Sequence, residues 1–160
     1  MIRRLGPDEW ELLREVRLRS LSDAPDAFAS TFEREAGFDP AVWRERVAAA
    51  AWFVGDDGDA TIGIVSGRRD PAYPELQRHL NAMWVAASAR GTGVATGLVD
   101  AVVAWAAADG ATELTLGVLR SNQRAVAFYL KCGFAALGEH FFLNDDPTRP
   151  VDIYRRDLTV

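Results

Sequence analysis

A glycine-rich turn between a predicted strand and a predicted helix has the composition of an anion-binding loop. It runs from Arg90 to Thr96 and contains Gly91 and Gly93. Glycine adopts positive φ angles and lets a ligand approach the backbone closely. The N–H groups of residues 92–95 lack intrahelical acceptors, and they lie where the helix dipole is positive. Such a turn binds phosphate without a lysine, and Arg90 adds a charge-assisted hydrogen bond. The alternative is a strand–helix turn with no ligand.

Two other phosphate-binding interpretations fit the spacing less well. A dinucleotide-binding fingerprint needs a third glycine three residues after the second, inside an early strand–helix–strand unit. Here Gly97 comes one residue late, and more than half of the chain precedes the turn. A Walker loop needs a lysine followed by serine or threonine, and Lys131 is the only lysine. Both nucleotide interpretations therefore rank below a different phosphate ligand.

A second group of candidate residues lies on a predicted helix that runs from Asn122 to Gly133. Asn122 and Tyr129 are two turns apart, so they share one helix face, and roughly 10 Å separates them along the axis. A phenol has a pKa of about 10, so Tyr129 keeps its proton at neutral pH and can donate it to a leaving group. The alternatives are a helix cap for Asn122 and a core aromatic for Tyr129.

Together, the two segments resemble the GNAT N-acetyltransferase superfamily. Arg90-x-x-Gly93-x-Ala95 is similar to its acyl-CoA pyrophosphate loop, Gln/Arg-x-x-Gly-x-Gly/Ala. The stretch from Asn122 to Phe134 matches Asn-x-x-Ala-x-x-Phe-Tyr-x-x-x-Gly-Phe at every named position. The resemblance implies an α/β (mixed α+β) fold in a single domain over residues 1–160. It implies a central mixed, mostly antiparallel sheet of about seven strands, flanked by helices and splayed at the acetyl-CoA site.

The resemblance also implies roles for individual residues. Acetyl-CoA would be the cosubstrate, with no metal, and an unidentified amine would be the acceptor. Tyr129 would be the general acid that protonates the departing thiolate. The backbone N–H of Val85 would stabilise the oxyanion, and Met83 and Val85 would pair with the pantetheine amides as an added strand does. The residues implied to contact the coenzyme are Met83, Val85, Arg90, Gly91, Thr92, Gly93, Val94, Ala95, Thr96, Asn122, Ala125 and Tyr129.

The general base is the least determined part of the predicted site. Many relatives place a glutamate on the strand before the loop, but residues 76–85 contain no acid. His79 is the candidate on this strand, because its unperturbed pKa of about 6.5 suits a base; a structural histidine is the alternative. The other candidates are Gln77 and Asn81 on the same stretch, Glu33 and Glu35 in the N-terminal half, and a water chain with no dedicated base.

Two segments outside the predicted core are expected to form the acceptor pocket, residues 22–38 and 140–150. Trp84 either lines this pocket or faces a helix. Two classes of function remain open: an N-acetyltransferase for a small-molecule or protein amine, and a non-catalytic domain that binds acetyl-CoA. The acids that could attract a cationic amine, or could be solvated surface groups, are Asp26, Glu33, Asp145 and Asp146.

The predicted elements place both motifs on a strand–helix–strand–helix frame. Asp56-Asp-Gly-Asp59 is a strong hairpin turn signal, and Asp109-Gly110 ends the helix after the glycine-rich turn. Residues 26–35 are expected as a short helix or a loop with helical turns. Strands are predicted at 2–5, 52–55, 61–67, 76–85, 113–118, 134–138 and 151–158, and longer helices at 7–22, 39–50, 93–108 and 122–133.

Composition restricts the possible partners and compartment. A length of 160 residues suits one domain, and a net charge of −5 argues against nucleic acid as a partner. No long uncharged apolar run predicts a membrane span, and the N-terminus does not resemble a signal peptide. The single cysteine, Cys132, forbids an internal disulfide and indicates a cytoplasmic protein; a small buried cysteine is more usual than a nucleophile. A homodimer through an edge strand is possible.

Overall fold

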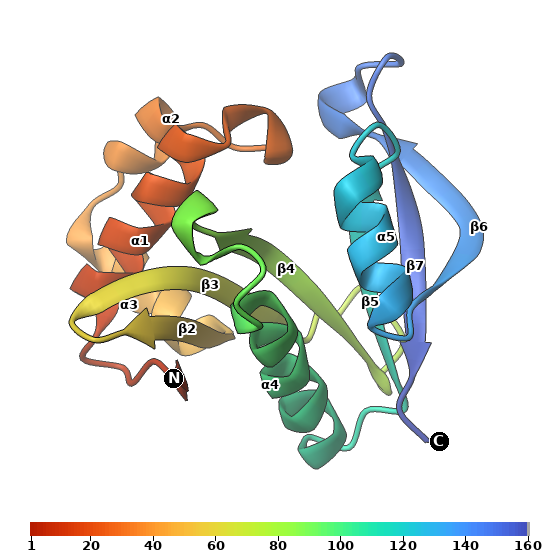
Figure 1. Ribbon diagram of the computed structural model, residues 1–160, viewed down its shortest axis with the longest axis horizontal. Coiled ribbons are helices and arrows are strands. Elements are labelled where there is room, and N and C mark those ends of the chain that lie inside the picture. Colours follow the sequence, from red (N-terminus) through yellow and green to blue (C-terminus); the bar gives the residue numbers. More distant parts are fainter. Residues whose placement is uncertain (160) are drawn as a thin grey trace.

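The computed structural model describes residues 1–159, and its centre is a seven-stranded sheet (Figure 1). The strand order is β1-β2-β3-β4-β5-β7-β6. Every neighbouring pair is antiparallel except β4 and β5, which are parallel. The predicted mixed, mostly antiparallel sheet is therefore confirmed. The strands are β1 (Ile2–Arg4), β2 (Ala51–Asp57), β3 (Ala60–Arg68), β4 (Gln77–Val85), β5 (Glu113–Leu119), β6 (Ala135–Phe142) and β7 (Pro150–Asp157).

Helices cover both faces of the sheet. Successive side chains of a strand point to opposite faces, so each strand contributes to both cores. On β2, Phe53 belongs to the core shared with α4 and α5, whereas Trp52 and Val54 belong to the core shared with α1 and α3. No helix in residues 1–159 is long and apolar enough to cross a membrane. The helices are α1 (Trp10–Asp23), α2 (Phe32–Ala36), α3 (Pro40–Ala49), α4 (Val94–Ala108) and α5 (Gln123–Lys131), with single turns η1 (Pro25–Ala27), η2 (Ala87–Ala89) and η3 (Leu143–Asp145).

The sheet splits between β4 and β5, as Figure 1 shows. These strands pair only from Gln77 to His79 on β4 and from Glu113 to Thr115 on β5. Just beyond that point, Ala82 adopts a positive φ of 58°, and the register with β3 shifts between Ile64 and Ser66. Such a bulge bends a strand and increases its twist. The bulge thus accompanies the divergence of β4 from β5, and the predicted splaying of the sheet is confirmed.

The sequence prediction was wrong about the length of the penultimate strand. A strand was expected to end at Gly138, but β6 continues to Phe142. Gly138 has φ of 80°, and the register with β7 shifts between Ala136 and His140. The glycine therefore accommodates a bulge inside the strand, and the polar connection to β7 is correspondingly shorter.

Candidate active site

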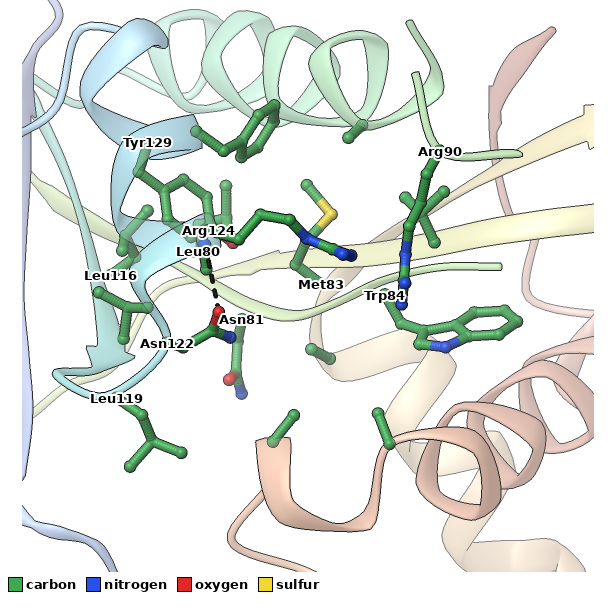
Figure 2. Close-up of a pocket in the computed structure, with 18 of the residues that line it drawn as sticks. Leu80, Asn81, Met83, Trp84, Arg90, Leu116, Leu119, Asn122, Arg124 and Tyr129 are labelled. Atoms are coloured by element: carbon green, nitrogen blue, oxygen red, sulfur yellow. Dashed lines mark hydrogen bonds between the residues drawn. The ribbon is translucent and has the colours of Figure 1, made fainter. Parts of the chain in front are cut away.

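A cleft of about 1000 Å³ opens where β4 and β5 diverge (Figure 2). Its walls come from β4, the turn before α4, the end of β5, the first two turns of α5, and η1. All the residues predicted to contact the coenzyme line it, except Thr92 and Val94. These lining residues are Met83, Val85, Arg90, Gly91, Gly93, Ala95, Thr96, Asn122, Ala125 and Tyr129.

The glycine-rich turn has the backbone geometry that its sequence suggests. Gly91 and Gly93 have φ angles of 78° and 89°, a region that other residues enter only at a cost. A Cβ atom built at either position would meet nothing within 4 Å, so the space beside the turn is open. Arg90 is exposed at the start of the turn, and its side chain extends toward Trp84 across the cleft wall (Figure 2).

The first amides of α4 are available to a ligand. Gly97 N–H makes the earliest hydrogen bond of the helix, to Gly93 O at 3.0 Å. In the described part of the chain, the N–H groups of Val94 to Thr96 donate to no protein acceptor. Thr92, however, donates its N–H to Ala89 O at 3.3 Å. The sequence prediction of a free amide at Thr92 was therefore wrong. Three consecutive amides therefore point out of the helix start, where the dipole favours an anion.

The cleft-facing edge of β4 is open beyond His79. Met83 and Val85 lie on this portion, after the last pair that β4 makes with β5. Among the strands of residues 1–159, none pairs with this edge. An extended, amide-containing ligand can therefore hydrogen-bond along β4 as an additional strand would.

Tyr129 and Asn122 project from α5 toward the opposite wall of the cleft (Figure 2). The Tyr129 ring is buried and packs against Phe128 and Phe134, with centroid distances of 5.2 and 5.9 Å. Burial raises the pKa of its phenol, so the hydroxyl stays protonated. Asn122 caps the helix, since its Oδ1 accepts the Ala125 N–H at 3.2 Å. Tyr129 is therefore a buried aromatic and Asn122 is a helix cap, as the alternative interpretations expected, and both residues also line the cleft.

His79 lies outside the cleft, on the part of β4 that pairs with β5. Its Nδ1 is 3.0 Å from Thr115 Oγ1, and its ring stacks on Tyr73 at 6.2 Å between centroids. Burial, with the nearby charge of Arg68, lowers its pKa to about 4. Neither the position nor the pKa of His79 supports the predicted role as general base, because the side chain does not line the cleft that Tyr129 lines.

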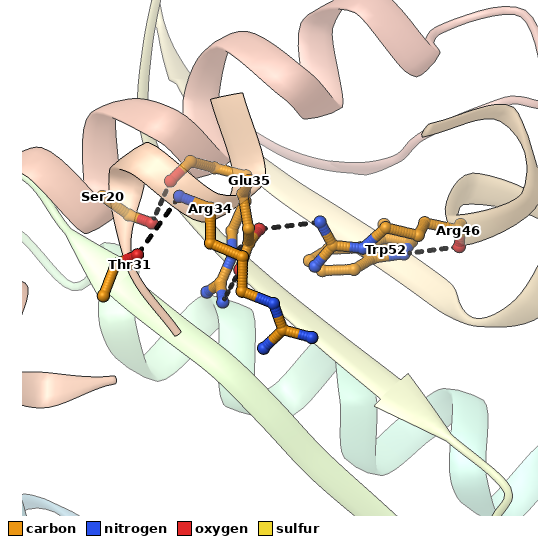
Figure 3. Close-up of polar contacts among 7 residues, drawn as sticks. Ser20, Thr31, Arg34, Glu35, Arg46 and Trp52 are labelled. Atoms are coloured by element: carbon orange, nitrogen blue, oxygen red, sulfur yellow. Dashed lines mark hydrogen bonds and ion pairs between the residues drawn. The ribbon is translucent and has the colours of Figure 1, made fainter. Parts of the chain in front are cut away.

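Glu35 is a structural carboxylate. Its side chain accepts two hydrogen bonds of 3.0 Å from Arg17 and one of 2.7 Å from Arg46 (Figure 3). Burial would raise the pKa of this carboxyl, but the two guanidinium groups outweigh burial and lower it to about 2. Glu33, on the same short helix, is exposed and does not line the cleft. Neither glutamate is placed to take a proton from an amine bound there.

The charged side chains that line the cleft are two arginines. Arg90 was predicted, whereas Arg124 was not, and it extends across the cleft toward Met83 (Figure 2). Its position two residues after the Asn122 cap is the sequence feature that could have indicated this placement. Among the residues of the described chain that line the cleft, none is Asp, Glu, His or Cys. Other lining residues that the sequence did not single out include Leu80, Leu116 and Leu119.

The two predicted acceptor segments contact each other, but only residues 22–38 line the cleft, through Ala24, Ala27 and Phe28, whereas none of residues 140–150 does. Asn144 Nδ2 donates to Ala29 O at 3.2 Å, and Arg149 donates to Asp26 O at 2.6 Å. Trp84 lines the cleft and also faces a helix, because its indole N–H donates to Asp23 on α1 at 2.9 Å. None of the acids proposed to attract an amine lines the cleft: Asp26, Glu33, Asp145 and Asp146 lie outside it.

Three comparisons relate this chain to known proteins. Residues 11–134 match the model of the acetyltransferase (GNAT) family. The chain is 31% identical over 96 residues to N-acetyltransferase 8F1 of Rattus norvegicus, covering 59% of this chain and 43% of that protein. It is 28% identical over 139 residues to peptidyl-lysine N-acetyltransferase YjaB of Escherichia coli strain K12, covering 86% and 83%. The structure of yncA from Salmonella typhimurium with its cofactor acetyl-CoA superposes with a TM-score of 0.77 at 12% identity, covering 100% and 94%.

These matches differ in what they support. The chain spans less than half the length of the curated relatives it matches first, at 43% and 44% of the rat and mouse N-acetyltransferase 8F1. The likeness to the Salmonella structure shows a shared fold. Within residues 1–159, no group of three or more His, Cys, Asp or Glu side chains is arranged to hold a metal ion.

Proposed function

The chain belongs to the acetyltransferase (GNAT) family, and from this we propose that it transfers the acetyl group of acetyl-CoA to a primary amine. The observation that carries the proposal is the open edge of β4, which leads directly to the free amides of Val94 to Thr96. An elongated ligand with amides along its arm and phosphates at its end matches that sequence of groups. The acetyl-CoA in the Salmonella structure of the same fold supports the choice of ligand.

In the proposed complex, the free amides at the start of α4 and the Arg90 guanidinium bind the pyrophosphate. The pantetheine arm lies along Met83 and Val85, and the Asn122 side-chain NH₂, which the helix cap leaves free, reaches it from α5. The thioester then lies between the β4 edge and Tyr129. This arrangement uses the residues of both sequence motifs.

The proposed reaction is a direct transfer. The lone pair of a neutral amine attacks the thioester carbonyl carbon, and a C–N bond forms. The oxyanion accepts a hydrogen bond from the backbone N–H of Val85. The C–S bond breaks, Tyr129 donates its proton to the leaving thiolate, and the nitrogen loses a proton to water, from which Tyr129 is reprotonated. Burial weakens Tyr129 as an acid, but the same water-poor surroundings make the thiolate a stronger base.

A thiol-release assay with acetyl-CoA and a panel of amines tests the proposed function. Small amines and peptide amines both belong in the panel, because one relative is described as a peptidyl-lysine N-acetyltransferase. We expect CoA release that depends on one class of amine. The alternative, a domain that binds acetyl-CoA without catalysis, is favoured by the absence of an acid from the cleft lining. Binding of acetyl-CoA with no amine-dependent release would establish that alternative.

The Gly93→Asp variant is expected to bind acetyl-CoA at least about tenfold more weakly, or roughly 1.4 kcal/mol. The new carboxylate would lie beside the pyrophosphate in space that is open in the free protein. Calorimetry on the folded variant measures the change. Gly93→Asn is the matched control, since asparagine tolerates a positive φ much as aspartate does and has the same shape without the charge. Equal affinities of the Asp and Asn variants would contradict a phosphate site at this turn.

We also propose a cytoplasmic location, supported by a single cysteine that is free and half-buried. A homodimer through an edge strand remains a prediction, and β1 and β6 are the two edges of the sheet.

A further inference from the structure

The absence of a proton acceptor from the cleft restricts which amines can react. We propose that the acceptor is an amine of low basicity, largely neutral before it binds, such as the α-amine of a peptide, and not a lysine ε-amine. This inference rests on the proposed function, because it concerns the nucleophile of that same reaction.

The side chains that line the cleft cannot remove a proton from an ammonium group at neutral pH. The polar ones are amides and hydroxyls: Asn81, Thr96, Asn122 and Tyr129. Amides do not titrate, and the raised pKa of Tyr129 keeps that phenol a donor. An ammonium nitrogen has no lone pair with which to attack a carbonyl. An acceptor that enters the cleft as a cation therefore has no protein group there to activate it.

Two titratable groups on nearby elements are held by other side chains. Glu35 is held by Arg17 and Arg46, and His79 is placed against Thr115. The charged or titratable groups on the elements around the cleft are Glu11, Arg14, Glu15, Arg17, Arg19 and Asp23 on α1, Asp26 on η1, Arg78 and His79 on β4, Asp100 on α4, Glu113 on β5 and Arg120 after it, Arg124 and Lys131 on α5, and Asp152, Arg155, Arg156 and Asp157 on β7.

The cleft itself carries positive charge. Arg90 and Arg124 line it, and no carboxylate balances them there. A nearby like charge disfavours the protonated form of an amine. Phosphates of bound coenzyme would offset Arg90 at the turn, but they would not supply a base. The electrostatics therefore favour entry of a neutral amine over entry of a cation.

The size of the expected preference follows from ordinary amine basicities. A lysine ε-amine has a pKa of about 10.4, so roughly one molecule in a thousand is neutral at pH 7.5. An α-amine has a pKa of about 8, so about a quarter is neutral. The ratio of reactive species is roughly two hundredfold. The greater nucleophilicity of the more basic amine reduces this ratio, and we expect at least a tenfold preference to remain.

A comparison of two peptides tests this preference. One has a free N-terminus and no lysine, and the other has the same length, an acetylated N-terminus and one lysine. At pH 7.5 we expect kcat/KM for the α-amine peptide to be at least about tenfold higher. An aniline-type amine forms a third arm and distinguishes peptide α-amines from aromatic amines. Equal or faster acetylation of the lysine peptide would overturn the inference and leave the proposed function intact.

The pH profile identifies the group that loses the proton. Without an enzyme base, log kcat/KM should rise with pH with a slope of one and level off at the acceptor's own pKa. Two acceptors whose pKa values differ by about two units should level off about two units apart. A break at the same pH for both would show an enzyme base and refute the inference. Asp23→Asn and Asp26→Asn, which remove the acids next to the lining residues Ala24 and Ala27, should not move the break. Failure of every amine to release thiol, with acetyl-CoA bound, would instead refute the proposed function.

Discussion

Replacing Tyr129 by phenylalanine is expected to lower the single-turnover rate of acetylation by about 10²–10⁴-fold, the usual range for a positioned proton donor. The phenylalanine ring keeps the packing against Phe128 and Phe134 and removes only the hydroxyl. The affinity for acetyl-CoA should change little. Single-turnover measurement is required, because slow product release would hide a loss in the chemical step.

Tyr154→Phe is the matched control for this experiment. Tyr154 is as buried as Tyr129, on β7, but it does not line the cleft. Its variant loses the hydroxyl of a buried tyrosine without affecting the proposed acid, so it should retain the wild-type rate. A Tyr129→Phe protein that acetylates as fast as the Tyr154→Phe control would show that Tyr129 only packs. The thiolate would then take its proton from water.

The Glu35→Gln variant is expected to be less stable than the wild-type protein by about 3 kcal/mol, because breaking a buried ion pair leaves an uncompensated charge. Glu35 is 2% exposed, and glutamine in its place would leave the buried Arg17 guanidinium without a counter-charge. Arg17 Nη1 already has no hydrogen-bond partner within the described structure. Denaturant unfolding with unchanged m measures the loss of free energy.

Glu33→Gln is the control for Glu35→Gln. It makes the same chemical change two residues earlier, at an exposed position, and should shift the unfolding free energy by less than about 0.5 kcal/mol. Acid should reduce the difference between wild type and Glu35→Gln. The folded-state pKa of about 2 lies below the ordinary 4.5, so the contribution of Glu35 is complete above pH 4.5 and declines toward pH 2. A difference that stays constant from pH 6 to pH 3 would contradict this assignment.

Local sequence signals predicted the elements that form the cleft. Glycines that require positive φ, an asparagine that caps a helix and a two-turn spacing to Tyr129 all act within a few residues. They identified the turn before α4 and the face of α5 correctly. The splayed sheet itself came from the resemblance, since the bulge at Ala82 has no glycine to mark it.

Tertiary partners determined the features that the sequence did not predict. Glu35 is buried because Arg17, eighteen residues earlier, neutralises it, and no local pattern reveals that pairing. Histidine is a residue type that can act as a base, but His79 lies where β4 still pairs with β5. Its surroundings therefore depend on Thr115 of another strand. Arg124 reaches into the cleft from a helix surface that periodicity alone would expose to solvent.

The contacts between the loop after α1 and the loop after β6 have a consequence for engineering new acceptor specificity. Asn144 and Arg149 donate to backbone carbonyls of residues 29 and 26, so the two loops support each other through main-chain atoms. Asn144 and Asp145 both have positive φ angles, which asparagine and aspartate tolerate better than most residues do. A graft that exchanges residues 24–30 alone would have to present the same two carbonyls to the resident C-terminal loop. Libraries that vary residues 24–30 and 143–149 together, with selection on the acceptor, should yield more folded and active variants than libraries that vary either loop separately.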